Sequence, residues 1–206
     1  MPPDATVFIV DDDAAMRESL RWLLESVSLD VETFANAEEF LAAYQPTRPG
    51  CLVLDVRMPG MSGLGLQETL VARNLTLPVI IITGYAEVPT AVRALKTGAI
   101  DFIEKPFSDD ILLERIRHAI AVDRQRRDEQ ALHADAEARF RQLTPREREV
   151  MDLVIAGKAN KVIAAELNLS PKTIEVHRGN LMKKMEVDSV AELVRLGLLL
   201  AGRGAH

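Results

Sequence analysis

The sequence between residues 6 and 122 alternates five times between a short apolar run and a longer amphipathic segment. Apolar, β-branched runs bounded by turn residues are typical of strands that are buried on both faces. Apolar residues at three- and four-residue spacing in the intervening segments indicate helices. Repeated β-α units with right-handed crossovers predict an α/β fold built on a doubly wound parallel sheet. We expect strands at 6–10, 31–34, 51–55, 79–82 and 99–104, and helices from Asp13 to about 27 and at 37–44, 64–73, 87–97 and 109–122.

Polar residues stand at the carboxyl ends of four of these strands. The first strand is followed by Asp11 and Asp12, the third ends in Asp55, the fourth is followed by Thr83, and the fifth by Lys105. Five β-α units most often take the flavodoxin-like strand order 2-1-3-4-5, which gathers these ends in one crevice. Taken singly, each Asp reads as a cap or turn residue, the Thr as a strand end and the Lys as a surface charge. Their joint occurrence at successive strand ends favours a functional site.

Three carboxylates in one crevice repel one another and raise each other's pKa unless a cation lies among them. A site with only oxygen ligands suits Mg²⁺ or Mn²⁺, and the absence of His and Cys at these positions argues against zinc. The same groups allow phosphoryl transfer to a carboxylate, with Asp55 as nucleophile. Thr83 can donate a hydrogen bond to one phosphoryl oxygen, and Lys105 can pair with another. Pro106 fixes the chain direction after Lys105, and we expect a cis bond there.

Composition and charge separate the chain into regions. The single cysteine, Cys51, excludes a disulfide framework and fits a reducing compartment. Neither a membrane-length apolar run nor a signal peptide is present, which predicts a cytoplasmic protein without a membrane partner. Residues 1–122 hold 10 Lys and Arg against 18 Asp and Glu, for a net charge of −8, whereas residues 143–206 hold 10 against 8, for +2. This difference predicts two domains with different partners.

Residues 118–142 are polar, rich in Ala and Arg, and free of Pro and Gly. This composition predicts that the fifth helix continues as a helical linker, residues 123–142, between domains at 1–122 and 143–206. We expect Arg124, Arg126 and Arg127 to form a solvated face, and His118 and His133 to be surface residues. The candidates for apolar contacts are Ile116, Ile120, Leu132, Ala136, Phe140 and Leu143.

The last 64 residues predict an all-α domain of four helices. Thr144, Pro145 and Glu147 form a capping box with proline at the first helical position, and Ser170 and Pro171 begin another helix. Helices are expected from 145 to the region before Gly157, at 160–167, at 171–185 and at 189–200. Two short helices joined by a tight turn, the second longer and basic, are typical of a helix-turn-helix. A small helical bundle that has a basic face and binds nothing remains an alternative at this point.

The first half resembles the receiver domain of bacterial two-component response regulators. The resemblance is carried by Val10-Asp-Asp12, the segment 54–60, Thr83-Gly84 and Lys105-Pro-Phe107. It implies that Asp55 is the phospho-acceptor, that Asp11, Asp12, Asp55 and the backbone carbonyl of Arg57 hold the metal, and that Thr83 and Lys105 sense the phosphate. Phe102 falls at the position of the family's switch aromatic, and a role as a core aromatic of the strand is nearly as good an interpretation.

The second half is similar to the LuxR-type output domain of NarL/FixJ response regulators, through residues 143–150, 160–167 and 170–178. The full chain resembles the FixJ branch most. By position, this resemblance implies that the third helix of the domain contacts DNA. The residues expected to face base edges are Glu175, Val176 and Gly179. Those expected to lie nearer the phosphate backbone are Lys172, Thr173, Arg178, Asn180 and Lys183.

These features predict a transcriptional regulator that a sensor histidine kinase phosphorylates. Phosphorylation is expected to promote a homodimer and binding to double-stranded promoter DNA, with RNA polymerase as a further partner. The expected dimer face carries Val92, Lys96, Ile100 and Arg115.

Two other functions are weaker. A phosphatase with an aspartyl nucleophile needs a general acid two residues beyond it, where Arg57 stands. A regulator that senses a small molecule needs a ligand cavity in the first half, where the acidic crevice favours metal and phosphate instead. We therefore do not expect an enzyme.

Overall fold

The computed structural model describes residues 5–84 and 88–201 of the chain. The chain divides into two compact units, residues 1–127 and 128–206. We refer to them as the first unit and the second unit and describe each by itself. Within the described residues, no helix has the length and apolar character needed to cross a membrane.

The described part of the first unit contains a five-stranded parallel sheet with the order β2-β1-β3-β4-β5, as predicted. The strands are β1 (Thr6–Val10), β2 (Asp30–Phe34), β3 (Gly50–Asp55), β4 (Val79–Thr83) and β5 (Asp101–Glu104). Every residue of the three central strands is buried, which explains why their sequences are continuous apolar runs. The register pairs Val10 with Leu54 and Asp55 with Ile82, so the carboxyl ends of these strands meet at one edge.

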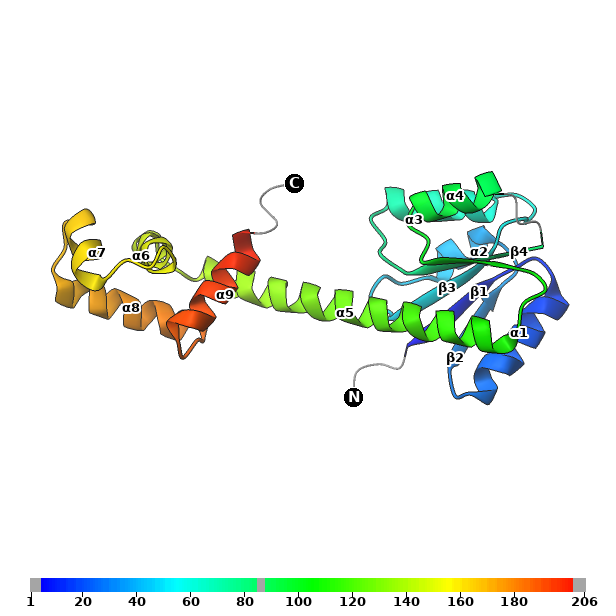
Figure 1. Ribbon diagram of the computed structural model, residues 1–206, viewed down its shortest axis with the longest axis horizontal. Helices are drawn as coiled ribbons and strands as arrows, with labels where there is room; N and C mark the ends of the chain where they lie inside the picture. Colours follow the sequence, from blue (N-terminus) through cyan, green and yellow to red (C-terminus); the bar gives the residue numbers. More distant parts are fainter. Residues whose placement is uncertain (1–4, 85–87, 202–206) are drawn as a thin grey trace. The chain divides into compact units, whose positions relative to one another are not determined.

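Helices cover both faces of this sheet (Figure 1). Core residues of α1 (Ala14–Ser26) and α5 (Asp109–Arg141) pack on one face, and those of α2 (Ala37–Ala43), α3 (Gly63–Ala72) and α4 (Val88–Lys96) on the other. The predicted start of the fourth helix, Glu87, lies outside the described residues. The loops after the strands are therefore the part of the sheet edge that the helices leave available for a site.

Local side-chain contacts begin the helices next to this edge. The Asp13 carboxylate accepts the backbone N–H of Ala15 and starts α1, as predicted. Ser62 caps α3 in the same way, and Gly63 follows it. A Cβ atom on Gly63 would lie 2.1 Å from the carbonyl oxygen of Asp55, so only glycine allows α3 to begin this close to the end of β3.

The fifth helix and the predicted linker form one helix, α5, from Asp109 to Arg141. Three predictions about its side chains are wrong. Leu132 is 62% exposed, whereas His133 is buried, because the buried side of the helix passes through His133 and Ala136. Arg127 is not part of a solvated face, because its guanidinium donates to backbone carbonyls of the first unit.

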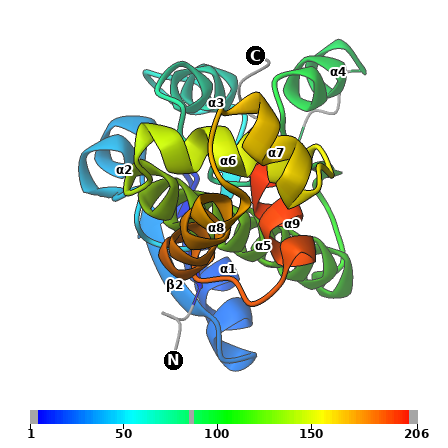
Figure 2. The same cartoon turned by 90° about the vertical axis from the view of Figure 1, so that its left-hand side faces the viewer.

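The described part of the second unit consists of helices, which Figure 2 shows together. They are α6 (Pro145–Ile155), α7 (Asn160–Glu166), α8 (Pro171–Met185) and α9 (Val190–Ala201), joined by the last turns of α5. The capping box of Thr144 and Glu147 is confirmed, and Ser170 caps α8. One residue from each helix, Val150, Ile163, Ile174 and Leu193, is fully buried in the common core. The predicted helix-turn-helix is thus α7 and α8, supported by α6 and α9.

Candidate functional site

Two of the predicted acids and the predicted lysine meet at the carboxyl edge of the sheet. The Lys105 ammonium lies 2.8 Å from Oδ2 of Asp11 and 2.8 Å from Oδ1 of Asp55. Asp11 follows β1, Asp55 ends β3, and Lys105 follows β5, so three separate strands bring the groups together. The other Asp55 oxygen accepts the backbone N–H of Arg57 at 2.6 Å. One ammonium therefore serves two carboxylates, both of which are buried.

This sharing leaves Asp55 short of compensating positive charge. Burial raises the pKa of Asp55, and the lowering by Lys105 and by the Arg57 N–H does not offset it. Burial would lower the pKa of Lys105, but the hydrogen bonds that its ammonium donates to Asp11 and Asp55 outweigh burial and raise the pKa. The lysine thus stays charged, while the site carries a net negative charge that a further cation would relieve.

The donor chemistry fits a hard divalent ion. Asp11 and Asp55 supply carboxylate oxygens, and Mg²⁺ commonly takes one or two protein carboxylates while it keeps several waters. Asp12, the third predicted acid, is exposed beside them. Among the residues that the structure describes, no three His, Cys, Asp or Glu side chains form a group that could hold a metal ion. The structure therefore brings together two of the three predicted acids, and the full ligand set stays a prediction.

The predicted sensing and switch residues lie on the neighbouring strands. Thr83 ends β4, is buried, and accepts the backbone N–H of Lys105 through its carbonyl oxygen at 2.8 Å. Phe102 lies on β5, is partly buried, and packs against the core under α2, α3 and α4. Thr83 and Phe102 therefore belong to the two strands at one side of the sheet, next to the strand that carries Asp55.

The predicted dimer-face residues lie on α4, α5 and the segment before β5. Val92 is 44% exposed and Lys96 is exposed, whereas Ile100 is partly buried against the core. Arg115 pairs with Asp101 at 2.9 Å. Val92 and Lys96 are therefore open to solvent. The side chain of Arg115 is 43% exposed, but it would have to leave or share Asp101 to reach a partner.

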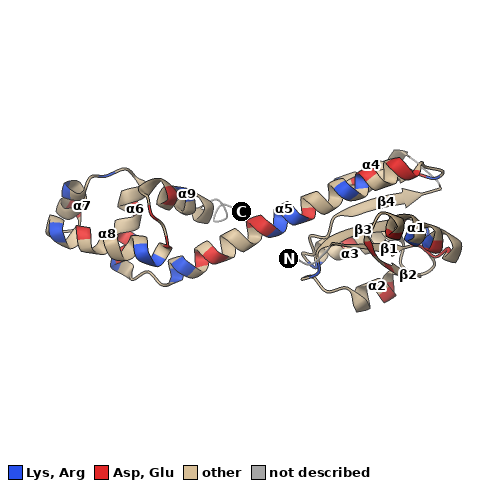
Figure 3. Cartoon of the chain, turned by 90° about the horizontal axis from the view of Figure 1, so that it is seen from below, with Lys and Arg blue, Asp and Glu red and all other residues tan. Residues whose placement is uncertain are grey.

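Helix α8 carries the predicted DNA contacts, and Figure 3 shows basic residues along it. Most of the predicted set is exposed, including Val176 at 58%. Thr173 and Arg178 are partly buried, and Arg178 donates to the side chain of Asn160 on α7 at 2.5 Å. The exposed members are Lys172, Glu175, Val176, Gly179, Asn180 and Lys183. The exposed side of α8 thus offers cations, a carboxylate and an apolar side chain, which are the groups that read DNA.

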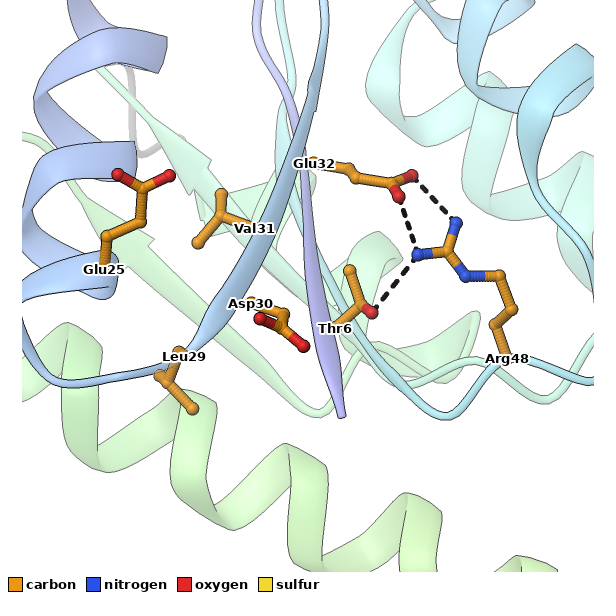
Figure 4. A pocket seen from close by; sticks show the side chains of 7 residues that line it. All are labelled: Thr6, Glu25, Leu29, Asp30, Val31, Glu32 and Arg48. Carbon is orange, nitrogen blue, oxygen red and sulfur yellow. Dashed lines mark hydrogen bonds and ion pairs between the residues drawn. The ribbon is translucent and has the colours of Figure 1, made fainter. Parts of the chain in front are cut away.

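Two arginines with structural roles were missed from the sequence. Arg48 binds both carboxylate oxygens of Glu32, at 2.6 and 2.9 Å, beside a cleft of about 320 Å³ (Figure 4). The cleft lies at the start of β1 and β2, away from the carboxyl edge with Asp55, and polar side chains dominate its lining. Arg127 fastens α5 to the loop before β3. No sequence signal marks them, because their partners are distant in the chain.

Comparison with known proteins agrees with this geometry. Residues 7–117 match the response regulator receiver domain, and residues 141–197 match the bacterial regulatory proteins of the luxR family. The FixJ transcriptional regulatory protein of Bradyrhizobium diazoefficiens is 47% identical over 93% of this chain and 94% of its own length. The chain belongs to the NarL/FixJ class of response regulators. It is therefore a phosphorylation-dependent transcriptional regulator of a two-component system, with a histidine kinase as partner and DNA as target.

Other relatives of this response regulator support the same assignment. Nodulation protein W of B. diazoefficiens is 46% identical over 98% of the chain and 89% of its own length. The solved structure of the response regulator StyR is 46% identical, covers 94% of this chain and 98% of its own, and has a TM-score of 0.87. Full-length FixJ from B. japonicum is 44% identical over 96% of this chain and 98% of its own, with a TM-score of 0.58.

Proposed function

We propose that this response regulator accepts a phosphoryl group on Asp55 from its sensor histidine kinase, with Mg²⁺ or Mn²⁺ bound. The observation that carries the proposal is the pair of hydrogen bonds, each 2.8 Å, from the Lys105 ammonium to Asp11 and Asp55. A buried carboxylate that shares a lysine with a second acid is stabilised in its ionised form when further positive charge binds beside it. We place the protein in the cytoplasm, where it meets both its kinase and promoter DNA.

The residues around Asp55 suit the chemistry of the transfer. An Asp55 oxygen attacks phosphorus, the bond from phosphorus to the donor imidazole nitrogen breaks, and the imidazole keeps the electron pair. Lys105 neutralises one phosphoryl oxygen of the aspartyl phosphate, and the Thr83 hydroxyl donates to another. The ammonium is already in contact with Asp55, so little reorganisation is needed before transfer.

A divalent ion would be held by Asp11, Asp12, Asp55 and the backbone carbonyl of Arg57. When bound, it supplies charge neutralisation for the transferred oxygens. The Arg57 backbone already turns toward the carboxylate, since its N–H donates to Asp55 at 2.6 Å. Asp12 is the exposed carboxylate of the set, so it is the acid most accessible to an ion that enters from solvent.

Phosphorylation would then change the packing around Thr83 and Phe102. Phe102 has no hydroxyl group, so any response there works through packing rather than a hydrogen bond. The change would reach the exposed side of α4 and its neighbours and promote a homodimer through Val92, Lys96, Ile100 and Arg115. The exposed apolar residues of α4, Val88, Val92 and Leu95, support this face as the one that a second copy covers.

Two copies of α8 would then bind a roughly palindromic promoter site and recruit RNA polymerase. Glu175 is suited to the N4 donor of cytosine and Val176 to the thymine methyl group, whereas Gly179 reads little. We place Lys172, Thr173, Arg178, Asn180 and Lys183 near the phosphate backbone. Arg178 shares its guanidinium with Asn160 of α7, which would set its direction.

Intact-mass measurement tests the acceptor. With a small phosphodonor and Mg²⁺, we expect one phosphate on the wild-type chain and none on Asp55→Asn. Asp30→Asn, which changes an exposed aspartate at the opposite end of the sheet, should still gain one phosphate. A phosphate on the Asp55→Asn protein would show that the acceptor is a different residue.

Binding of the phosphorylated full chain to genomic DNA fragments tests the output. Lys172→Ala should weaken binding to all sequences and lower the salt dependence by about one counterion. Val176→Ala should instead change which fragments are selected. Arg195→Ala on α9 removes the same charge from an exposed position that we do not assign to DNA, and it should leave the salt dependence unchanged. Equal effects of Lys172→Ala and Arg195→Ala would contradict α8 as the recognition helix.

A further inference from the structure

Helix α5 carries two matched pairs of an aspartate and an arginine that also bind other parts of the chain. Asp123 pairs with Arg127 at 2.7 Å and Asp135 pairs with Arg139 at 2.6 Å, both with i,i+4 spacing. In each pair the guanidinium also donates to the backbone outside the helix, Arg127 to three carbonyl oxygens and Arg139 to one. The two pairs lie on opposite sides of the boundary between the units, at residues 127 and 128. We call them the first and the second clamp.

The first clamp fastens α5 to the loop before β3. Arg127 donates to the carbonyl oxygens of Pro46, Thr47 and Arg48, at 3.1, 3.3 and 2.7 Å. Asp123, which is 1% exposed, accepts both the guanidinium and the backbone N–H of Gly50, at 2.9 Å. A buried carboxylate and its arginine thus satisfy four backbone groups at the start of the central strand, which fixes this turn of α5 to the sheet.

The second clamp fastens α5 to the end of the recognition helix. Arg139 donates to the carbonyl oxygen of Met185, the last residue of α8, at 3.0 Å, and pairs with Glu186 at 3.2 Å. The carbonyls in the last turn of a helix have no partner within it, and a cation there also stabilises the helix dipole. Arg139 therefore joins the linker helix directly to the C-terminal end of α8.

Between the clamps, α5 is a helix with exposed residues on all sides. Residues 128–132 are all exposed, Leu132 at 62%, although they are helical throughout. This stretch is longer than one helical turn, so the helix has exposed residues on every side here. The backbone hydrogen bonds of the helix therefore maintain this part of α5.

We propose that α5 couples the receiver to DNA recognition through these two clamps, with Arg139 as the residue that positions α8. The inference rests on the proposed phosphorylation of Asp55. Each arginine donates to the backbone at a defined position, Arg127 to three carbonyl oxygens and Arg139 to one. Such directed hydrogen bonds fix the rotation of α5 against its unit more strictly than apolar contact does. A change in the receiver that moves the first clamp is passed by the continuous helix to the second clamp and so to the end of α8.

The chain provides matched controls for both arginines. Arg141 pairs with Glu137 on α5 at the same i,i+4 spacing, but its side chain is 75% exposed and has no described contact with another element. Arg124 is an exposed arginine on α5 next to the first clamp. Substituting either of these removes one charge from the same helix and leaves both clamps intact.

Hydrogen exchange of the full chain tests the coupling. We compare the chain before and after treatment with a small phosphodonor and Mg²⁺, and follow the peptide at residues 181–187. In the wild type, phosphorylation should change exchange there by about tenfold, the size expected for one hydrogen bond to a charged donor. Arg127→Gln and Arg139→Gln should reduce this change to about twofold or less, and Arg139→Lys should restore part of it. Arg124→Gln and Arg141→Gln should keep the full change.

Two further readings separate coupling from folding and from phosphorylation. Phosphate uptake by intact mass must be unchanged in Arg127→Gln and Arg139→Gln, and unchanged protection of α6 must show that the second unit remains folded. A full exchange response in either clamp variant would overturn the proposal, as would a phosphorylated wild type without a response at residues 181–187. A wild type that takes up no phosphate would instead overturn the proposed function itself.

Discussion

Asp55 in the first unit and Glu147 in the second unit are both buried carboxylates that contact a lysine, and their pKa values are shifted in opposite directions. Asp55 is 6% exposed and lies 2.8 Å from Lys105, and Glu147 is 3% exposed and lies 2.7 Å from Lys184. Burial by itself would raise the pKa of both carboxylates. For Glu147 the hydrogen-bond and charge partners outweigh burial and lower the pKa, whereas for Asp55 they do not and the pKa is raised.

The two pKa shifts differ in direction because the two carboxylates differ in the number of hydrogen-bond donors that they do not share with another acid. Glu147 receives Lys184, the backbone N–H of Thr144 at 2.8 Å and the Thr144 hydroxyl at 3.0 Å, and shares none of them with another acid. Asp55 shares Lys105 with Asp11. A fully compensated carboxylate stabilises a fold, whereas an under-compensated one marks a place where a cation or a phosphoryl group can be accepted.

The largest expected effect is at the compensated site. Lys184→Met leaves Glu147 buried without its cation, and we expect it to lower the free energy of unfolding of the second unit by about 3 kcal/mol. The urea dependence of amide exchange in α6 measures this. Lys183→Met, an exposed neighbour on the same helix, should change it by less than about 0.5 kcal/mol. Equal effects of the two substitutions would mean that the pair with Glu147 contributes nothing.

The second expected effect is a pH dependence of opposite sign in the two units. Because the pKa of Glu147 in the folded protein is below its ordinary value of 4.5, its stabilisation is present above that pH. That stabilisation is lost as the pH falls through the folded pKa. The pKa of Asp55 is raised above 3.8, so ionised Asp55 destabilises the first unit, and acid relieves this as the pH falls through its folded pKa.

Acid titration followed by amide exchange in α6 and in β3 tests these signs. Glu147→Gln should flatten the acid loss in α6 without changing β3. If that loss were the same with and without the substitution, other groups would cause it and the comparison between the two carboxylates would fail.

How much of this could be predicted from the sequence depends on how local the signal is. The strand order and the site at its carboxyl edge follow from the five β-α units, because parallel strands necessarily bring Asp11, Asp55 and Lys105 to one edge. The capping box of Thr144 and Glu147 is equally local and is confirmed. The burial of Glu147 and its pairing with Lys184 on another helix are not visible in such a pattern.

The burial of side chains on α5 could not be predicted from the sequence pattern. A three- or four-residue step back from Ala136 reaches either His133 or Leu132, and hydrophobicity selects Leu132. The structure buries His133 instead, because the helix meets the second unit along a line through His133, Ala136 and Phe140. Arg127 was missed for a related reason, since its acceptors are carbonyls of residues 46–48, and a backbone carbonyl has no residue-specific signature.

The smallest expected effect is at the under-compensated site and has the opposite sign from the first. Asp55→Asn removes the disfavoured charge, and Asp11 continues to accept a hydrogen bond from Lys105. In the absence of metal, we therefore expect the free energy of unfolding of the first unit to rise by about 1 kcal/mol at neutral pH. Urea unfolding followed by amide exchange in β3 measures it, and Asp12→Asn, at an exposed position on the same edge, should change it by less than about 0.5 kcal/mol. A fall in stability would mean that the pair with Lys105 outweighs the cost of burial. Asp55 would then be a structural carboxylate like Glu147, and the contrast between the two units would no longer identify the acceptor.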